Sequence, residues 1–346
     1  MRKFLILPLI LLMFAVPAQA LEFEAPPVPE TAEKFMPAQQ ENFLQGVLEV
    51  LRDAILHIHP DLREAAAVCL SIAAVVMCVS ILRTIPGASE QTIALAGSIG
   101  IAVVLFQSSN SLLNLAVSTV TQVSEYGKLL LPVMTAAMAA QGGISSSTAL
   151  YAATAFFDAL LTSVIGKLLI PLIYLILLLS VASSAIGQDT LKKLRDTLKG
   201  LTTWSLKTIL YVYTGFISIT GVVSGTTDAA ALKAAKLTIS GAVPVVGGIL
   251  SDASEAVLVS AGILKNAAGI YGLFAILAIW IGPFLRIGVH YLLLKGTGAV
   301  CTIFAGKAHT ELIQDFSSAM GLLLALTGTT CLMFMISLVC YLKGVG

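Results

Sequence analysis

Long runs of apolar residues, separated by short polar segments, make up most of the chain. Several runs reach about 20 residues, which is the length a helix needs to cross a bilayer. None of them shows the two-residue alternation of a membrane β-strand. The pattern predicts an all-α polytopic membrane protein with about six full spanning helices. The long apolar runs lie at 65–82, 92–117, 148–164, 166–184, 203–224, 269–294 and 317–342.

Two further apolar stretches are interrupted by proline and glycine, and each predicts a short broken hairpin. The first is 129–140, which contains Pro132. The second, 240–262, reads SGAVPVVGGILSDASEAVLVSAG and contains Pro244, Gly247 and Gly248. Its small residues favour close contact between helices.

The prolines suggest an internal repeat. Pro132 and Pro171 are separated by the same length of chain as Pro244 and Pro283. Corresponding broken segments in two halves are a known pattern in transporters. We therefore expect repeats at 91–187 and 203–299, with chance similarity between apolar helices as an equal alternative.

The N-terminal part differs from the rest. Residues 1–20 combine a basic start, a short apolar run and Ala18-Gln19-Ala20, which predicts a signal peptide, the alternative being an uncleaved first helix. Residues 21–64 are acidic and predict an extracytoplasmic segment with an amphipathic helix, lying on the bilayer or against a partner. Residues 65–346 then form the polytopic membrane domain.

A basic segment at 188–203 is the main topology marker. Its leucines, at 191, 194, 198 and 201, form one helical stripe among Lys192, Lys193, Arg195 and Lys199. Such a helix is typical of an interfacial cytoplasmic segment. The side of the membrane that holds the C-terminus stays open, because the second hairpin can either re-enter or cross.

Composition excludes several functions. Charged residues are only 11% of the chain, against roughly 25% in soluble proteins, so much of its surface faces something other than water. The net charge is +1 and no basic patch suggests nucleic acid. The five cysteines lack metal-ligand spacing. P-loop, HExxH and GxSxG motifs are absent, so we predict no enzyme, no catalytic or metal-binding residues and no cofactor.

Charged residues within apolar runs are the remaining candidates for function. Asp252 and Glu255 share a helical face and predict either a conduction path or the first turn of a helix capped by Ser251. The candidate structural or functional residues are Pro244, Gly247, Gly248, Asp252, Glu255, Lys265, Arg286 and Asp158.

The stretch 217–273 resembles the stage III sporulation protein AE family. The residues that carry the resemblance are Thr227-Asp228, AAKLTISGAVPVVGGILSDA, Leu264-Lys265-Asn266 and the preceding TTWSLKTIL. The resemblance implies a membrane component of the channel between mother cell and forespore, acting as export platform or assembly hub. It also implies a place in the outer forespore membrane and partners from the same operon, including a cytoplasmic ATPase and ring-forming proteins.

The residues alone leave a second function open. An autonomous small-solute or ion permease would use Asp252, Glu255 and Asp158. The two functions differ in whether these carboxylates are needed for more than folding.

Overall fold

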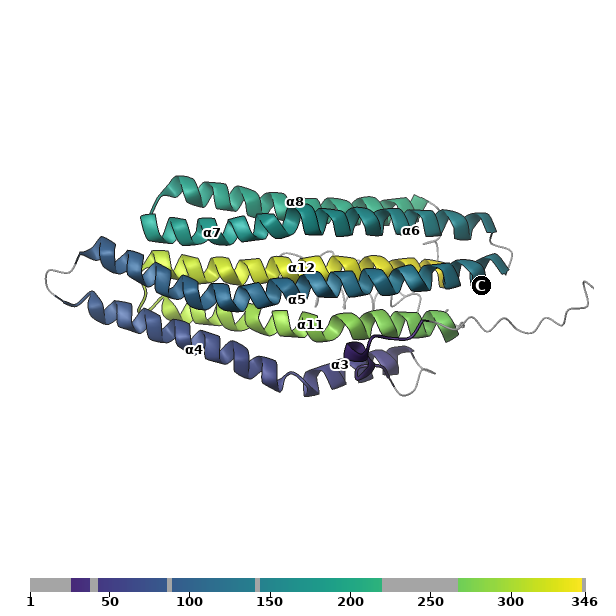
Figure 1. The fold of residues 1–346 in the computed structure, drawn as a ribbon, viewed down its shortest axis with the longest axis horizontal. Helices are drawn as coiled ribbons and strands as arrows, with labels where there is room; N and C mark the ends of the chain where they lie inside the picture. The colour runs from purple at the N-terminus through teal and green to yellow at the C-terminus, as the bar shows by residue number, and fades with distance from the viewer. Residues whose placement is uncertain (1–25, 38–42, 86–88, 141–143, 220–266, 344–346) are drawn as a thin grey trace, which may run out of the picture.

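The computed structural model describes residues 26–37, 43–85, 89–140, 144–219 and 267–343, and all of its regular structure is helical (Figure 1). Two short helices, α2 and α3, precede the long ones, and a π-helical turn, Ile165–Leu169, joins α6 to α7. The helices are α2 Glu30–Glu33, α3 Phe43–Leu56, α4 His59–Leu82, α5 Glu90–Ala140, α6 Ile144–Val164, α7 Ile170–Ile186, α8 Asp189–Ile219, α11 Ala267–Cys301 and α12 Lys307–Lys343.

The long helices lie side by side in an elongated bundle, with α12 in its interior (Figure 1). Helix α12 contacts α5, α6, α7, α8 and α11, and its apolar 18-residue window is completely buried. In contrast, only 22% of the corresponding window of α4 is buried. The bundle is therefore built around α12, while α4 presents most of its apolar surface outward.

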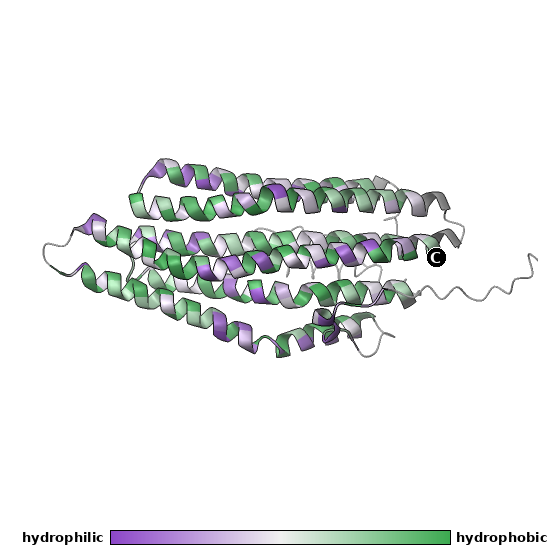
Figure 2. Ribbon diagram, viewed as in Figure 1, coloured by the Kyte–Doolittle hydropathy of each residue, from purple (hydrophilic) through white to green (hydrophobic). Residues whose placement is uncertain are grey.

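Five of the described helical segments are long and apolar enough to cross a membrane, and apolar residues predominate along them (Figure 2). They are His59–Leu82, Glu90–Ala137, Ser147–Ile186, Ala268–Cys301 and Lys307–Leu342. This confirms the predicted all-helical membrane class. The predicted span at 203–224 falls partly outside the described residues, and α8 as described is not among the five.

The predicted break at Pro132 is wrong. Helix α5 runs without interruption for 51 residues and carries Pro132 in its interior. Proline removes one backbone hydrogen bond, but proline is tolerated in membrane helices when neighbouring helices and nearby hydroxyl groups support the freed backbone. Near Pro132, Thr135 Oγ1 donates to the carbonyl of Leu131 and lies 3.0 Å from the Tyr341 hydroxyl of α12, which connects this part of α5 to α12.

The two separate spans predicted at 148–164 and 166–184 form one continuous rod. The π-helical turn connects them, and the Ile170 N–H bonds to the Ile165 carbonyl five residues earlier. Pro171 follows immediately, at the start of α7. The wider turn accommodates a proline that has no N–H and whose ring crowds the preceding turn.

The basic segment is not a separate interfacial helix. It forms the first turns of α8, which continues to Ile219 and packs against α7 and α12. Arg195 is buried, whereas Leu194 and Leu201 are exposed. The charged face therefore points into the bundle and part of the leucine stripe points away from it, because acidic partners on α12 receive the basic side chains.

The predicted amphipathic helix is α3, and it lies against α11 of the same chain. Phe43 stacks on Phe274 of α11 with ring centroids 5.6 Å apart. Gly46 allows this approach, since a Cβ there would lie 2.3 Å from the Phe274 ring. Residues 1–25 and 220–266 lie outside the described residues, so the signal peptide, the second hairpin and the internal repeat stay predictions.

Candidate functional site

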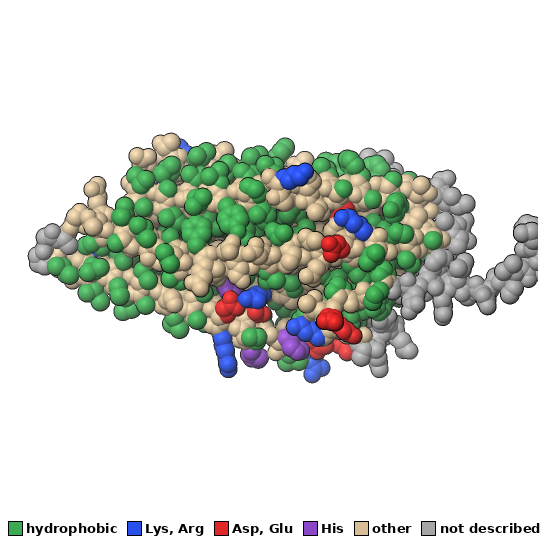
Figure 3. All heavy atoms as spheres, in the orientation of Figure 1, with side chains coloured by type: hydrophobic (Ala, Val, Ile, Leu, Met, Phe, Trp, Pro, Cys, Tyr) green, Lys and Arg blue, Asp and Glu red, His purple; other side chains and the backbone are tan. Residues whose placement is uncertain are grey.

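Most of the candidate residues from the broken stretch lie outside the described part of the chain. They are Pro244, Gly247, Gly248, Asp252, Glu255 and Lys265. Arg286 and Asp158 are described, and the structure places them in separate helix contacts. On the face shown in Figure 3, charged side chains gather in a few places between broad apolar areas, notably near the junction of α3 and α4.

Arg286 joins α11 to the start of α4. Its Nη2 donates to Glu64 Oε2 at 2.7 Å, and its Nε lies 3.4 Å from Asp61 Oδ1. These acids come from the segment that the sequence assigned to the acidic extracytoplasmic region. About a third of the Arg286 side chain is exposed, so this ion pair fixes geometry more than it stabilises the fold.

His290 lies one turn after Arg286 and is buried. Its Nδ1 is 3.0 Å from the Arg286 carbonyl, and because a carbonyl only accepts, Nδ1 carries the proton. Its Nε2 has no hydrogen-bond partner among the described residues. Among the described residues, the side chain of His290 therefore makes one hydrogen bond, to the Arg286 backbone, and its Nε2 has no partner in the interior.

Asp158 is almost completely buried on α6, with 1% of its surface exposed. Ser124 of α5 donates to its Oδ2 at 2.8 Å, and Lys128 Nζ lies 3.7 Å from the same oxygen. Ser124 and Lys128 are one turn apart and so face the same neighbour. This arrangement pins α6 to α5 through a buried carboxylate.

The strongest charged cluster joins α8 to α12, and we call it the α8–α12 clasp: Lys192, Arg195, Lys199, Glu311 and Asp315. Arg195 Nη1 donates to Asp315 Oδ2, Lys199 Nζ donates to Asp315 Oδ1 at 2.7 Å, and Lys192 Nζ lies 2.7 Å from Glu311 Oε2. Arg195 and Asp315 are both buried. The acids are one turn apart on α12, opposite bases at matching helical spacing on α8.

Arg195 stays a cation within the clasp. Burial acts to lower its pKa, but hydrogen bonds to Asp196 and Asp315 and the charges of both carboxylates raise the pKa on balance. The sequence identified the basic half and missed the acidic half, because Glu311 and Asp315 fell in a segment expected to be a polar loop. The structure begins α12 at Lys307, which makes both acids helical.

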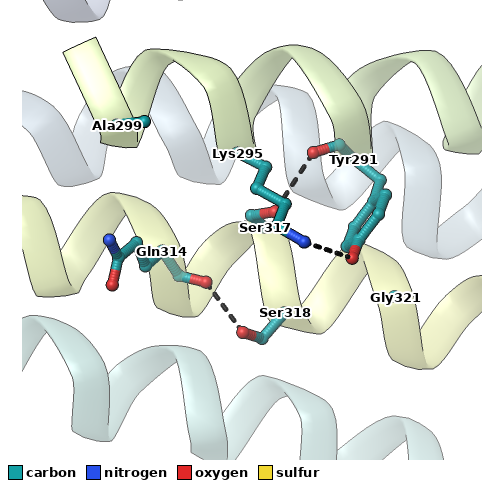
Figure 4. Close-up of a pocket in the computed structure, with 7 residues that line it drawn as sticks. All are labelled: Tyr291, Lys295, Ala299, Gln314, Ser317, Ser318 and Gly321. Carbon is teal, nitrogen blue, oxygen red and sulfur yellow. Dashed lines mark hydrogen bonds between the residues drawn. The ribbon is translucent and has the colours of Figure 1, made fainter. Parts of the chain in front are cut away.

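A pocket of about 440 Å³ lies between α11 and α12 (Figure 4). Its lining residues are Tyr291, Lys295, Ala299, Gln314, Ser317, Ser318 and Gly321. Lys295 Nζ lies 3.4 Å from the Tyr291 hydroxyl and 5.5 Å from the centre of its ring. Ser317 donates to the Tyr291 carbonyl at 3.1 Å, and Ser318 donates to the Gln314 carbonyl at 2.8 Å.

The described residues contain no cluster of three or more His, Cys, Asp or Glu side chains that could hold a metal ion. All five cysteines are free thiols. The charged groups described above connect helices in pairs. The absence of enzyme activity stays a prediction.

These features define an all-helical, multi-pass membrane protein in which the buried acids Asp158 and Asp315 of the described bundle pair with bases of neighbouring helices. The family described as stage III sporulation protein AE matches residues 31–344. The chain therefore belongs to the stage III sporulation protein AE family.

A curated relative is similar over part of this length. Stage III sporulation protein AE of Bacillus subtilis (strain 168) is 25% identical over 226 residues, which cover 65% of this chain. The chain spans 57% of the length of that relative. No solved structure matches the chain.

Proposed function

We propose that the chain is a membrane component of the channel complex between mother cell and forespore that endospore formation requires. Within that complex it acts as an assembly hub or export platform in the outer forespore membrane. Its partners are other proteins of the stage III sporulation operon, including a cytoplasmic ATPase and ring-forming proteins. Family membership and five candidate membrane spans support this proposal.

One observation favours a hub over an autonomous permease. The central helix α12 is enclosed by other helices, and the buried acids Asp158 and Asp315 are each engaged by a base from a neighbouring helix. Charges within membrane helices face the bundle interior or a water-filled cavity, and they often pair with one another. In the described bundle the pairs of Asp158 and Asp315 hold helices together, as a scaffold requires.

The carboxylates of the broken stretch provide the test. We expect Asp252→Asn combined with Glu255→Gln to leave the protein inserted and to impair sporulation only mildly, because both acids fit the first turn of a helix. Heat-resistant spores are counted in cells that carry the double variant as their only copy. Complete loss of spores, with normal protein level and normal partner recruitment, would favour the permease.

The sequence contains no P-loop, which fits a membrane component whose energy comes from a separate ATPase. A hub without its own nucleotide site depends on a partner for energy. The cytoplasmic ATPase proposed as a partner would supply it.

A further inference from the structure

The pocket between α11 and α12 has a chemistry that the proposed hub role does not use. It contains one cation, Lys295, and its lining includes no carboxylate. Among the other bases of this bundle, Arg286, Arg195 and Lys199 all pair with acids. Lys295 has only the Tyr291 phenol as a neighbour for its ammonium group among the described residues. Its charge therefore has no carboxylate partner among the described residues and can bind an anion.

The pocket offers hydrogen-bond donors that suit a phosphate group. The Lys295 ammonium has three donors and directs one to the Tyr291 oxygen, which leaves two. The Tyr291 hydroxyl accepts that bond and so keeps its own proton to donate. Gln314 also lines the pocket, but its amide points away from Lys295 and Tyr291 (Figure 4). The hydroxyl groups of Ser317 and Ser318 instead donate hydrogen bonds to backbone carbonyls, so these residues only line the pocket.

The surface around Lys295 is apolar and exposed. Leu292, three residues before Lys295 and on the same side of α11, is 63% exposed, and Val300 and Ile303, at the end of α11 and in the turn after it, are 61% and 74% exposed. A single cation within such a strip is expensive in a bilayer unless it reaches the interface or meets an anion. A lipid with an anionic head and apolar tails matches both parts of this surface.

The pocket also lies near the end of the bundle that holds the start of α8. Lys192 of α8 contacts Glu311 near the start of α12, and the turn before α12 directly follows α11. Arg83 follows the end of α4, Lys193 lies near the start of α8 and Lys307 begins α12, and these helix ends lie at the same end of the bundle (Figure 1). An excess of Lys and Arg marks the cytoplasmic side, where anionic lipids attract basic groups.

We propose that this pocket binds the phosphate of an anionic phospholipid, with Lys295 and Tyr291 holding the phosphate and the exposed Leu292 contacting an acyl chain. The purified full-length chain is tested by native mass spectrometry with phosphatidylglycerol and, separately, phosphatidylcholine. We expect it to retain phosphatidylglycerol preferentially. Lys295→Gln should reduce that preference about fivefold, since one basic residue near a lipid surface contributes about 1 kcal/mol.

Two matched variants make the result specific. Lys295→Arg keeps the charge and should retain the preference. Lys34→Gln removes an exposed lysine that follows α2, away from this end of the bundle, and should leave the preference unchanged. An equal loss in Lys295→Gln and Lys34→Gln would overturn the proposal, as would equal retention of the two lipids by the wild-type chain.

A competition separates the lipid from free phosphate. Inorganic phosphate at the same concentration as the lipid should not displace phosphatidylglycerol, because the acyl chain adds apolar binding. Displacement would show a site for free phosphate and overturn the lipid assignment. A Lys295→Gln variant that keeps its lipid preference but loses a protein partner from purified complexes would assign the pocket to that partner instead.

Discussion

Buried charges in this chain are the residues most sensitive to change. Arg195 and Asp315 are 7% and 6% exposed, and Lys199 binds the same carboxylate. A buried ion pair gives little net stability compared with an apolar pair, but removing one partner leaves a costly uncompensated charge. The clasp therefore predicts a large effect from a single substitution.

We expect Asp315→Ala to lower the free energy of unfolding by about 3 kcal/mol, because it leaves Arg195 buried without a carboxylate on α12. Thermal unfolding of the detergent-purified protein measures the change. Glu311→Ala is the control, since it breaks the more exposed pair with Lys192 and should cost less than about 1 kcal/mol. A loss from Asp315→Ala no larger than the loss from Glu311→Ala would mean that the buried Arg195–Asp315 pair is not the main contact of the clasp.

The sequence pattern identifies single charged residues, but it does not predict which residues they contact. Asp158 stood out because it interrupts an apolar run, whereas Ser124 and Lys128 lie outside that run, in an earlier part of the chain. Which helix face meets which neighbour depends on tertiary packing. Spacing along one helix cannot supply that information, even where, as with Glu311 and Asp315, it was regular.

Helices in this bundle approach closely through glycine. A Cβ at Gly127 of α5 would lie 2.0 Å from the Phe334 ring of α12, and one at Gly272 of α11 would lie 2.4 Å from Leu130. Small residues permit such contacts in membrane helices, where van der Waals packing drives association. The sequence assigned this role to glycines of the second hairpin, and the structure shows it at glycines of the long helices.

Gly127→Ala is expected to destabilise the protein by about 1–3 kcal/mol, because the added methyl overlaps the Phe334 ring and forces the helices apart. The matched control is Gly215→Ala in α8, where nothing lies within 4 Å of the new methyl. That change should be neutral or stabilising by up to about 1 kcal/mol, since alanine favours helix. Thermal unfolding of both variants decides, and an unaffected Gly127→Ala protein would contradict the described contact.

A second prediction concerns helix α5, which continues as one helix through Pro132. Spin labels at Asn114 and Ala136, with the exposed Cys78 changed to Ser, should be about 33 Å apart if about 22 residues of helix separate them. Double electron–electron resonance measures this distance. A clearly shorter distance would restore the broken hairpin that the proline suggested, because a hairpin folds the second label back toward the first.

Pro132 and Pro171 explain why the helix boundaries predicted from the sequence differ from those of the structure. The local effect of proline, a missing hydrogen bond, is real at both positions. Neither proline breaks its helix. Helix α5 continues through Pro132 while packed against α11 and α12, and a π-helical turn accommodates Pro171. Local patterns predicted the existence and apolar character of these helices well, and their ends poorly.

The whole molecule is longer than a bilayer is thick. The 51 residues of α5 correspond to about 76 Å, whereas the hydrocarbon core measures about 30 Å. Part of the bundle must therefore extend beyond the hydrocarbon, where it can contact other proteins. This dimension suits a component that connects a membrane to a larger assembly, and it could not be read from a pattern that divided α5 into a span and a hairpin.

Recovery of partners tests the central claim most directly. The chain carrying an affinity tag, as the only copy in sporulating cells, is extracted from membranes, purified and analysed by quantitative mass spectrometry. We expect the ATPase and the ring-forming proteins of the stage III sporulation operon to be recovered with it. They should be absent when an unrelated tagged membrane protein is purified in parallel. A chain that supports normal sporulation at its normal level, yet is recovered free of all these proteins, would contradict the hub.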